Sequence, residues 1–244
     1  MEHQFNELLP RLPGGRAFSH ERRPGFSDCA PSGRMRLDAI AGWLQDIAYA
    51  DVDDAGLAEA AVWVVRRTRI RVLRWPRFGE RFTLTTFCSG LGRMWAERRT
   101  DVALTGESEP MVEAVSLWVH LAPDSWRPVP LTEGEIATYG GTVTERRVSA
   151  RLRHGPPPAD AERGTWTFRR TECDIADHVN NAAYWQPLEE ELLAGPEPAG
   201  IDVELEYRTP TQAGEKSVLS AGPWRWIASP EGDLHASLVV GGDV

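Results

Sequence analysis

The hydrophobic positions of this chain recur with two periods, one typical of helices and one typical of strands. Leu37, Ile40, Leu44 and Ile47 follow the spacing of a single helix face and predict an amphipathic helix. Runs rich in β-branched and aromatic residues that alternate with polar ones predict strands. In the first half of the chain these runs are 17–28, 62–73, 81–88, 94–104 and 112–121.

The second half repeats this order in a shorter form. Trp166 and Phe168 alternate with polar residues in a predicted strand at 165–170, and an amphipathic helix is predicted at 182–193. Three further strands are expected, beginning at Val203, Ser217 and Leu234. The chain therefore contains one strand–helix–strands unit used twice, an α+β fold, because a helix in each half argues against a pure β-sandwich.

Residues 136–163 separate the two units and are rich in Gly, Ala, Arg and Pro, including the run Gly-Pro-Pro-Pro at 155–158. Such a composition is typical of a surface connection. We therefore expect an N-terminal domain at 15–135, a linker at 136–163 and a C-terminal domain at 164–244. A length of 244 residues fits two domains of ordinary size.

Composition and charge narrow the classes of function. No run approaches the roughly 18 apolar residues of a membrane span, and the first residues lack the basic and apolar regions of a signal peptide. A net charge of −9 argues against a general nucleic-acid binder. Cys29, Cys88 and Cys173 are odd in number and widely separated, so they show no metal-ligand spacing and suggest no disulfide framework. We expect a cytoplasmic protein with no metal and no organic cofactor.

The basic residues are almost all arginine, and Arg67, Arg69 and Arg71 alternate so that they share one face of a strand. Two interpretations of this stripe stay open. Either the face is solvated, or its guanidinium groups bind a partner that carries carboxylates or phosphates. Arginine suits such a partner because its planar fork pairs with either group through two hydrogen bonds.

The richest chemistry lies at residues 171–185, just after a predicted strand. Asp174 and His178 stand shortly before Asn180 and Asn181, and asparagine is a preferred helix N-cap. A carboxylate, an imidazole and a helix N-terminus would thus meet in one small volume, and acyl transfer uses these groups. The spacing alone favours a plainer interpretation, in which Asp174 fixes a turn, His178 is a satisfied polar residue and Asn181 is a cap.

A resemblance to a known family favours the catalytic interpretation over the plainer one. The residues Asp174-Ile-Ala-Asp-His178-Val-Asn-Asn-Ala-Ala-Tyr184 resemble the Asp-x-x-x-His-Val-Asn-Asn-x-x-Tyr signature of hot-dog-fold thioesterases. More narrowly, they resemble the acyl-acyl-carrier-protein (acyl-ACP) thioesterases of fatty-acid synthesis. Other segments resemble strands of that family in the expected order, namely 62–80, 89–99, 114–119 and 205–208.

The resemblance covers about residues 15–225 and implies a double, or tandem, hot-dog fold. In that fold each half wraps an antiparallel sheet around one long helix. The first half is then expected to hold the acyl chain, and the second half to carry the catalytic residues.

The match to the catalytic residues of the family is incomplete. Hydrolysis there is attributed to an Asp, an Asn, a His and a later Glu. Asp174 and His178 match the first and third, but Ala176 occupies the Asn position and Pro210 the Glu position. The resemblance implies a site that relies mainly on Asp174, as general base or nucleophile. His178 is expected to orient the carboxylate or to protonate the leaving thiolate.

Asn180 and Asn181 begin the predicted helix and are the expected substrate-binding residues, because the first N–H groups of a helix can bind an oxyanion. On the same helix, Glu189 is a further pocket candidate. Cys173 is not expected to be a nucleophile, since no papain-like cysteine–histidine signature surrounds it. One or two tryptophans are expected to line an acyl tunnel, and the candidates are Trp43, Trp63, Trp75, Trp95 and Trp118.

The implied function is hydrolysis of fatty-acyl thioesters, with acyl-ACP or acyl-coenzyme A as substrate and partner. Two alternatives stay open. The losses at Ala176 and Pro210 favour a hot-dog protein that binds acyl thioesters without hydrolysing them. A hot-dog dehydratase or hydratase is disfavoured by the Val-Asn-Asn helix start. No nucleic acid or membrane is expected as a partner, and a tandem fold, which already contains a pair of units, fits a monomer or a homodimer.

Overall fold

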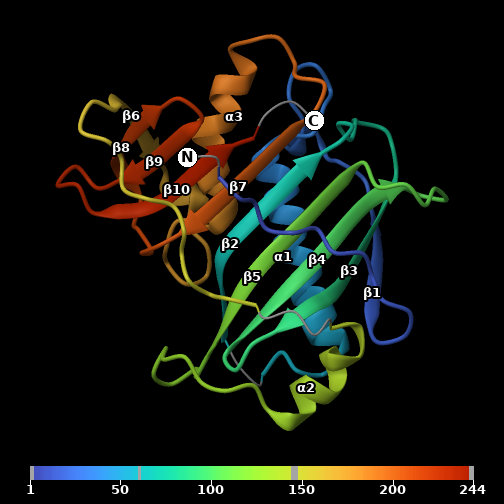
Figure 1. Cartoon of the computed structure of the whole chain (residues 1–244). Coiled ribbons are helices and arrows are strands. Elements are labelled where there is room, and N and C mark those ends of the chain that lie inside the picture. The colour runs from blue at the N-terminus through green and yellow to red at the C-terminus, as the bar shows by residue number, and fades with distance from the viewer. Residues whose placement is uncertain (1–2, 60–61, 144–147, 242–244) are drawn as a thin grey trace.

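The structure is a computed structural model that describes residues 3–59, 62–143 and 148–241. The strands of this part of the chain form one antiparallel sheet in the order β1-β3-β4-β5-β2-β7-β10-β9-β8-β6 (Figure 1). The strands of the first half are β1 (Ala17–Arg22), β2 (Val62–Val72), β3 (Phe82–Leu91), β4 (Trp95–Leu104) and β5 (Val112–Leu121). Those of the second half are β6 (Glu162–Phe168), β7 (Ile201–Tyr207), β8 (Gly214–Ala221), β9 (Trp224–Ala228) and β10 (Leu234–Val240).

The long helix α1 (Leu37–Asp54) packs against the first half of this sheet, behind the strands in the view of Figure 1. Its apolar stripe is buried as the periodicity predicts, with Leu37, Ile40, Leu44 and Ile47 all in the hydrophobic core. Burial of such side chains contributes about 1.5–3 kcal/mol each. The stripe is therefore what holds α1 against the sheet.

The second half differs from the single long helix that the pattern predicts at 182–193. Residues Asn181–Trp185 form a 3₁₀ turn, η4, and only Gln186–Leu193 form an α-helix, α3. Pro187 explains the change, because it has no N–H to donate to the carbonyl of Ala183. That carbonyl instead accepts from the N–H of Gln186, the tighter pattern of a 3₁₀ turn.

The two halves join through β2 and β7, which pair antiparallel along residues 67–72 and 201–206. One hydrophobic core includes residues of both halves, and α1 contacts η4 and α3. The structure confirms the α+β double hot-dog fold. The division at 15–135, 136–163 and 164–244 stays a prediction. The interval 136–163 begins inside the short helix α2 (Glu133–Tyr139), includes the turn η2 (Gly140–Thr142) and partly lies outside the described residues.

The arginine stripe of β2 faces acidic residues of β7 across this junction. The strand register pairs Arg67 with Glu206, Arg69 with Glu204 and Arg71 with Asp202. Arg69 makes two hydrogen bonds to the Asp202 carboxylate, at 2.8 and 2.5 Å, and Arg67 lies 3.5 Å from Glu206. Both sequence interpretations are therefore wrong for Arg67 and Arg69, which neither face open solvent nor await a partner.

Two segments without regular secondary structure cover these charges. The backbone N–H groups of Arg153 and His154 donate to the Glu206 carboxylate at 2.7 and 2.9 Å, and the N–H of Asn6 donates to Glu204 at 3.0 Å. In Figure 1 the N-terminal segment crosses the face of the sheet opposite to α1. Glu204 and Glu206 are consequently fully buried, although they stand on the outer face.

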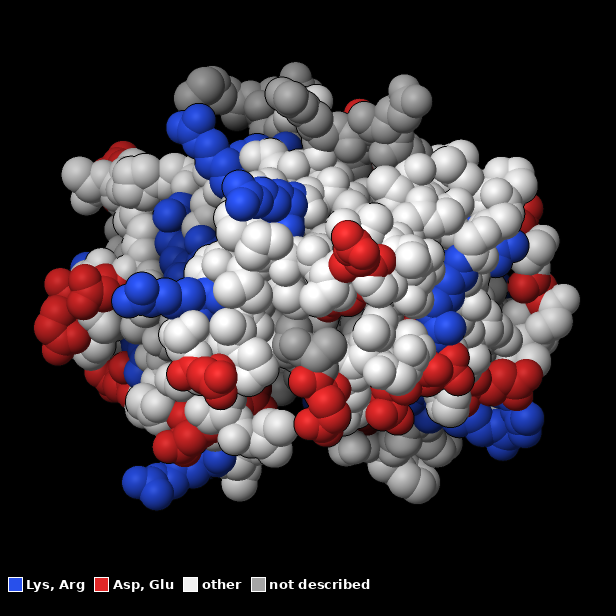
Figure 2. Space-filling model, turned by 90° about the horizontal axis from the view of Figure 1, so that it is seen from below, with Lys and Arg blue, Asp and Glu red and all other residues white. Residues whose placement is uncertain are grey.

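On the face shown in Figure 2, acidic and basic side chains are interspersed and form no broad field of one sign. No helix within the described residues has the length and apolar character that a membrane crossing requires.

Candidate functional site

The segment between β6 and η4 closes into a tight loop. Cys173 and Val179 form an isolated antiparallel bridge. Inside it, the N–H of Asp174 donates to the carbonyl of His178 at 2.9 Å, and the N–H of Asp177 donates to the carbonyl of Asp174 at 3.0 Å. Asp177 has a φ of 56°, in the left-handed region that aspartate tolerates better than most residues. Asp174 and His178 thus stand at the two ends of one turn.

Two donors fix the Asp174 carboxylate. The backbone N–H of Ala176 donates to Oδ1 at 2.9 Å, and the Nδ2 group of Asn180 donates to Oδ2 at 3.3 Å. Asp174 is only partly buried, and a carboxylate has further lone pairs for a ligand. Because the donor at Ala176 belongs to the backbone, this contact survives without the asparagine side chain of the family signature.

His178 lies on the same turn but is not bonded to Asp174. It is partly buried, and its ring makes no hydrogen bond to any residue that the structure describes. The orientation of Asp174 therefore comes from Ala176 and Asn180. Both imidazole nitrogens of His178 remain available to a ligand.

Asn180 also caps the helical segment. Its Oδ1 accepts from the N–H of Ala182 at 2.8 Å, and its carbonyl accepts from the N–H of Ala183 at 2.9 Å. These two N–H groups are therefore already used at the helix start that was expected to bind an oxyanion. The N–H of Asn181 makes no hydrogen bond within the described part of the chain and is the donor that remains.

A buried chain of hydrogen bonds supports this helix start from behind. The hydroxyl of Tyr207 donates to the carbonyl of Asn181 at 3.0 Å and accepts from Nε1 of Trp185 at 3.0 Å. Burial raises the pKa of Tyr207, so its hydroxyl stays protonated and able to donate. No signal in the sequence around Asn181 points to this role, because Tyr207 belongs to a distant strand that only the fold brings beneath Asn181.

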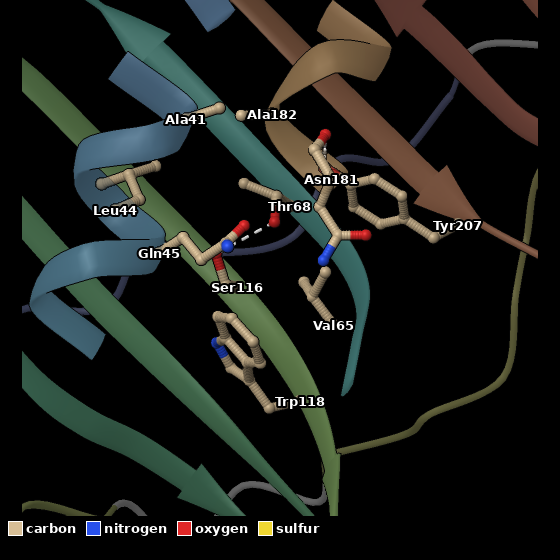
Figure 3. Close-up of a pocket in the computed structure, with 10 residues that line it drawn as sticks. All are labelled: Ala41, Leu44, Gln45, Val65, Thr68, Ser116, Trp118, Asn181, Ala182 and Tyr207. Carbon is tan, nitrogen blue, oxygen red and sulfur yellow. Dashed lines mark hydrogen bonds between the residues drawn. The ribbon is translucent and has the colours of Figure 1, made fainter. Parts of the chain in front are cut away.

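A pocket lies beside the helix start, between the two halves (Figure 3). Its lining combines small, apolar and polar side chains from α1, β2, β5, η4 and β7, namely Ala41, Leu44, Gln45, Val65, Thr68, Ser116, Trp118, Asn181, Ala182 and Tyr207. The hydroxyls of Thr68 and Ser116 are hydrogen-bonded at 3.0 Å, and Gln45 extends toward them from α1. The free volume is only ≈ 10 Å³, about the space of one water molecule. A bound acyl chain would have to displace side chains here.

The first half contains a copy of the Asp174 loop with other side chains. Cys29 and Met35 form the corresponding bridge. The N–H of Ala30 donates to the carbonyl of Arg34 at 2.8 Å, and the N–H of Gly33 donates to the carbonyl of Ala30 at 2.8 Å. Gly33 has a φ of 85°, the same left-handed region as in the other loop.

Ala30 and Arg34 therefore stand where the second loop has Asp174 and His178. The backbone of the loop is used twice, but a carboxylate and an imidazole occur together only in the second copy. Any chemistry that needs both groups is thus restricted to one of the two related positions.

Glu189 lies at the first copy and does not line the pocket. Its carboxylate accepts from the N–H of Leu37 at 3.0 Å and is 2.9 Å from Nη2 of Arg34. Burial raises the pKa of Glu189, although the contacts to Leu37 and Arg34 oppose this rise. In the internal repeat, Gln45 corresponds to Glu189 and Asn181 corresponds to Leu37. The copy of the loop that contains Asp174 therefore has a neutral amide where the first copy has a carboxylate.

Known proteins with similar sequences include acyl-ACP thioesterases. The model of the acyl-ACP thioesterase N-terminal domain matches residues 18–139. An uncharacterised protein of Mycobacterium tuberculosis is 30% identical over 210 residues, which are 85% of this chain and 83% of that protein. The chloroplastic palmitoyl-acyl carrier protein thioesterase of Arabidopsis thaliana is 25% identical over 85% of this chain and 54% of its own.

Solved structures agree in fold. An acyl-ACP thioesterase from Bacteroides thetaiotaomicron matches with a TM-score of 0.75 at 18% identity, over 92% of this chain and 98% of that one. The 12:0-ACP thioesterase from Umbellularia californica matches with a TM-score of 0.71 at 19% identity, over 92% and 96%. The solved structures agree in fold, and the family model, which matches half of the chain, shows that the chain belongs to the acyl-ACP thioesterase family.

Proposed function

We propose that this protein hydrolyses fatty-acyl thioesters to the free acid and the thiol, with acyl-ACP as the substrate and acyl-coenzyme A as a second thioester of the same chemistry. The observation that carries the proposal is the Asp174 carboxylate, held by two donors beside a helix start and a pocket. The process is then fatty-acid synthesis, and the compartment is the cytoplasm.

Asp174 is the catalytic residue of this proposal. As general base it takes a proton from water, the resulting hydroxide attacks the thioester carbonyl, and the C–S bond breaks. As nucleophile it attacks the carbonyl itself, and water then hydrolyses the mixed anhydride. Both routes consume one water and release one carboxylic acid and one thiol.

Three other groups are assigned supporting roles. His178, whose ring makes no hydrogen bond to a residue in the described ranges, protonates the leaving thiolate. The N–H of Asn181 donates to the carbonyl oxygen as negative charge develops there. Gln45 faces the same space from α1 and can hold the attacking water or the thioester through its amide.

The apolar lining of the pocket supports the proposal that the acyl chain enters the first half of the protein. Leu44, Val65 and Trp118 offer apolar surface between α1 and the sheet, next to Asn181. Of the five tryptophans considered from the sequence, Trp118 lines this pocket, whereas the indole N–H groups of Trp75 and Trp95 donate to the carbonyls of Pro198 and Val148.

The second candidate function is binding of acyl thioesters without hydrolysis. It is favoured by Ala176 and Pro210, which stand where the family signature has polar side chains.

Thiol release from acyl-ACP and acyl-coenzyme A panels of short, medium and long chains separates the two functions. We expect release by the native protein and a loss of about 10²–10⁴-fold in Asp174→Asn, the usual worth of a positioned acid–base group. Asp177→Asn, on the same loop but without a contact to the carboxylate of Asp174, is the matched control. Binding without release by the native protein, or undiminished release by Asp174→Asn, would contradict the proposal.

A further inference from the structure

Far from the Asp174 loop along the chain, three potential metal ligands meet on the outer face of β7. They are His3 of the N-terminal segment, His154 of the segment before β6, and Glu204 of β7. Nε2 of His3 lies 2.9 Å from Oε1 of Glu204, and Nε2 of His154 lies 3.5 Å from the same oxygen. All three ligand atoms lie within 4.8 Å of one another.

The bonding of His154 leaves its inner nitrogen without a partner. Nδ1 is 3.2 Å from the carbonyl oxygen of Ser237 and 3.0 Å from its hydroxyl. In the tautomer whose Nδ1 hydrogen donates to that carbonyl, the neutral ring presents a bare lone pair at Nε2. This fully buried Nε2 has no hydrogen-bond partner among the described residues, and it is directed at an anionic oxygen.

In this tautomer two acceptors face each other in a buried place, and a metal cation between them would satisfy both. A carbonyl-bonded histidine with its other nitrogen turned inward is the usual form of a metal-ligating histidine, because the outer bond sets the tautomer and the ring orientation. Glu204 supplies the negative charge, and its Oε2 is anchored by the N–H of Asn6 at 3.0 Å.

The spacing fits a small tetrahedral ion. Bonds of about 2.0–2.2 Å in tetrahedral geometry separate neighbouring ligand atoms by about 3.3 Å. The two separations from Oε1 of Glu204, 2.9 and 3.5 Å, bracket that value, and the two histidine nitrogens lie within 4.8 Å of each other. Aromatic rings close the site, since both histidines stand edge-on to Trp224, with centroids 5.4 and 5.0 Å away.

We propose that His3, His154 and Glu204 bind one zinc ion, which fastens the N-terminal segment and the segment before β6 to the outer face of β7. Two imidazoles and one carboxylate are a ligand set that zinc accepts, and that magnesium and calcium, which prefer all-oxygen sites, do not. Three protein ligands leave the fourth position to water. The role is structural, because the ion joins residues that are far apart in the sequence.

The positive charge of a neighbouring arginine repels the ion, and its removal gives the experiment a second outcome of opposite direction. Nη2 of Arg153 lies 3.6 Å from Oε1 of Glu204 and also contacts Oδ1 of Asn6. A guanidinium this close competes with zinc for the carboxylate. Its removal should therefore strengthen zinc binding, whereas removal of a ligand should weaken it.

The experiment uses the untagged full chain, stripped with EDTA and titrated with zinc against a chromophoric chelator. We expect one zinc per chain, weakening of at least about tenfold in His3→Ala and His154→Gln, and tighter binding in Arg153→Ala. The matched control is His20→Ala, which removes an exposed histidine of β1. His3→Ala alters a segment without regular secondary structure and is expected to leave the fold intact.

A thermal melt supplies the second readout. Zinc at a hundredfold excess over its Kd should raise Tm by roughly 5–10 °C in the native protein and in His20→Ala, but not in His3→Ala. Magnesium should have no effect. Absence of one-to-one zinc binding, equal binding by His3→Ala, or a stability that responds to pH but not to zinc would each overturn the proposal, the last by showing that a proton alone joins these groups.

Discussion

At the scale of single residues, Asn180 has two separate tasks. Its Oδ1 accepts from the N–H of Ala182 and so caps η4, while its Nδ2 donates to the Asp174 carboxylate. One side chain thus ties the helix start to the proposed catalytic group. The sequence indicates the cap, because asparagine is common at that position. The bond to Asp174 depends on the closed loop and was not predicted.

The two tasks of Asn180 can be separated by substitution. Asn180→Ser keeps an oxygen that can cap the helix but loses the donor to Asp174, and Asn180→Ala loses both. We expect Asn180→Ala to lower the free energy of unfolding by about 1 kcal/mol, and Asn180→Ser to stay near the native value. Both should lose at least about tenfold in turnover, the worth of a hydrogen bond to a charged group. Urea denaturation and thiol release measure these effects, and full turnover in Asn180→Ser would show that Asn180 does not position Asp174.

At the scale of elements, the same loop and helix start serve two purposes. In the first half, Arg34 and Glu189 make a buried ion pair that joins the loop before α1 to α3. In the second half, the corresponding loop carries Asp174 and a partly buried His178. The backbone of each loop is encoded locally, since Gly33 and Asp177 both tolerate the left-handed conformation. The partners across the halves are set by packing.

The Arg34–Glu189 pair should be costly to break from one side. Glu189→Ala leaves the buried guanidinium of Arg34 with only the more distant and partly exposed Glu197, 3.9 Å from its Nε. Loss of the partner of a buried charge typically costs about 3–5 kcal/mol of stability. The double variant Arg34→Met with Glu189→Met removes both charges and should recover most of that loss. Urea denaturation of the three proteins checks this. A loss below about 1 kcal/mol in Glu189→Ala, as found for exposed pairs, would show that the pair does not hold α3 in place.

At the scale of the whole molecule, a row of buried charges holds the halves together. Arg67 and Arg69 of β2 meet the carboxylates of β7, and residues 3–9 and 148–155 cover them. Burial alone would raise the pKa of Glu204, but the groups that face its carboxylate, namely His154, His3, the N–H of Asn6 and the guanidinium of Arg153, lower the pKa well below the ordinary value.

This depressed pKa predicts a loss of stability in acid. A carboxyl group whose pKa is lower in the folded state stabilises the fold above its unfolded pKa, and this contribution is lost as the pH falls through the folded value. In EDTA, the free energy of unfolding should therefore decrease as the pH drops below 4.5. Glu204→Gln should make that decrease shallower. Urea titrations over a pH series test this, with exposed Glu162→Gln as control, and equal slopes in Glu204→Gln and the native protein would contradict it.

The sequence by itself determined the repeated order of strands and helices, the class of the fold and the loop that carries Asp174 and His178. These features are local, because they depend on side-chain period, on turn residues and on a helix cap. The break in the second helix also has a local cause, the missing N–H of Pro187, although the apolar period of the segment predicts an unbroken helix.

The contacts between the halves were decided only by the tertiary structure. Tyr207 beneath Asn181, Gln45 beside it, Glu189 on Arg34 and the acids of β7 opposite the arginines of β2 all join residues that are remote in sequence. Strand register and helix packing select such partners, and periodicity within one segment carries no information about which distant segment will lie against it.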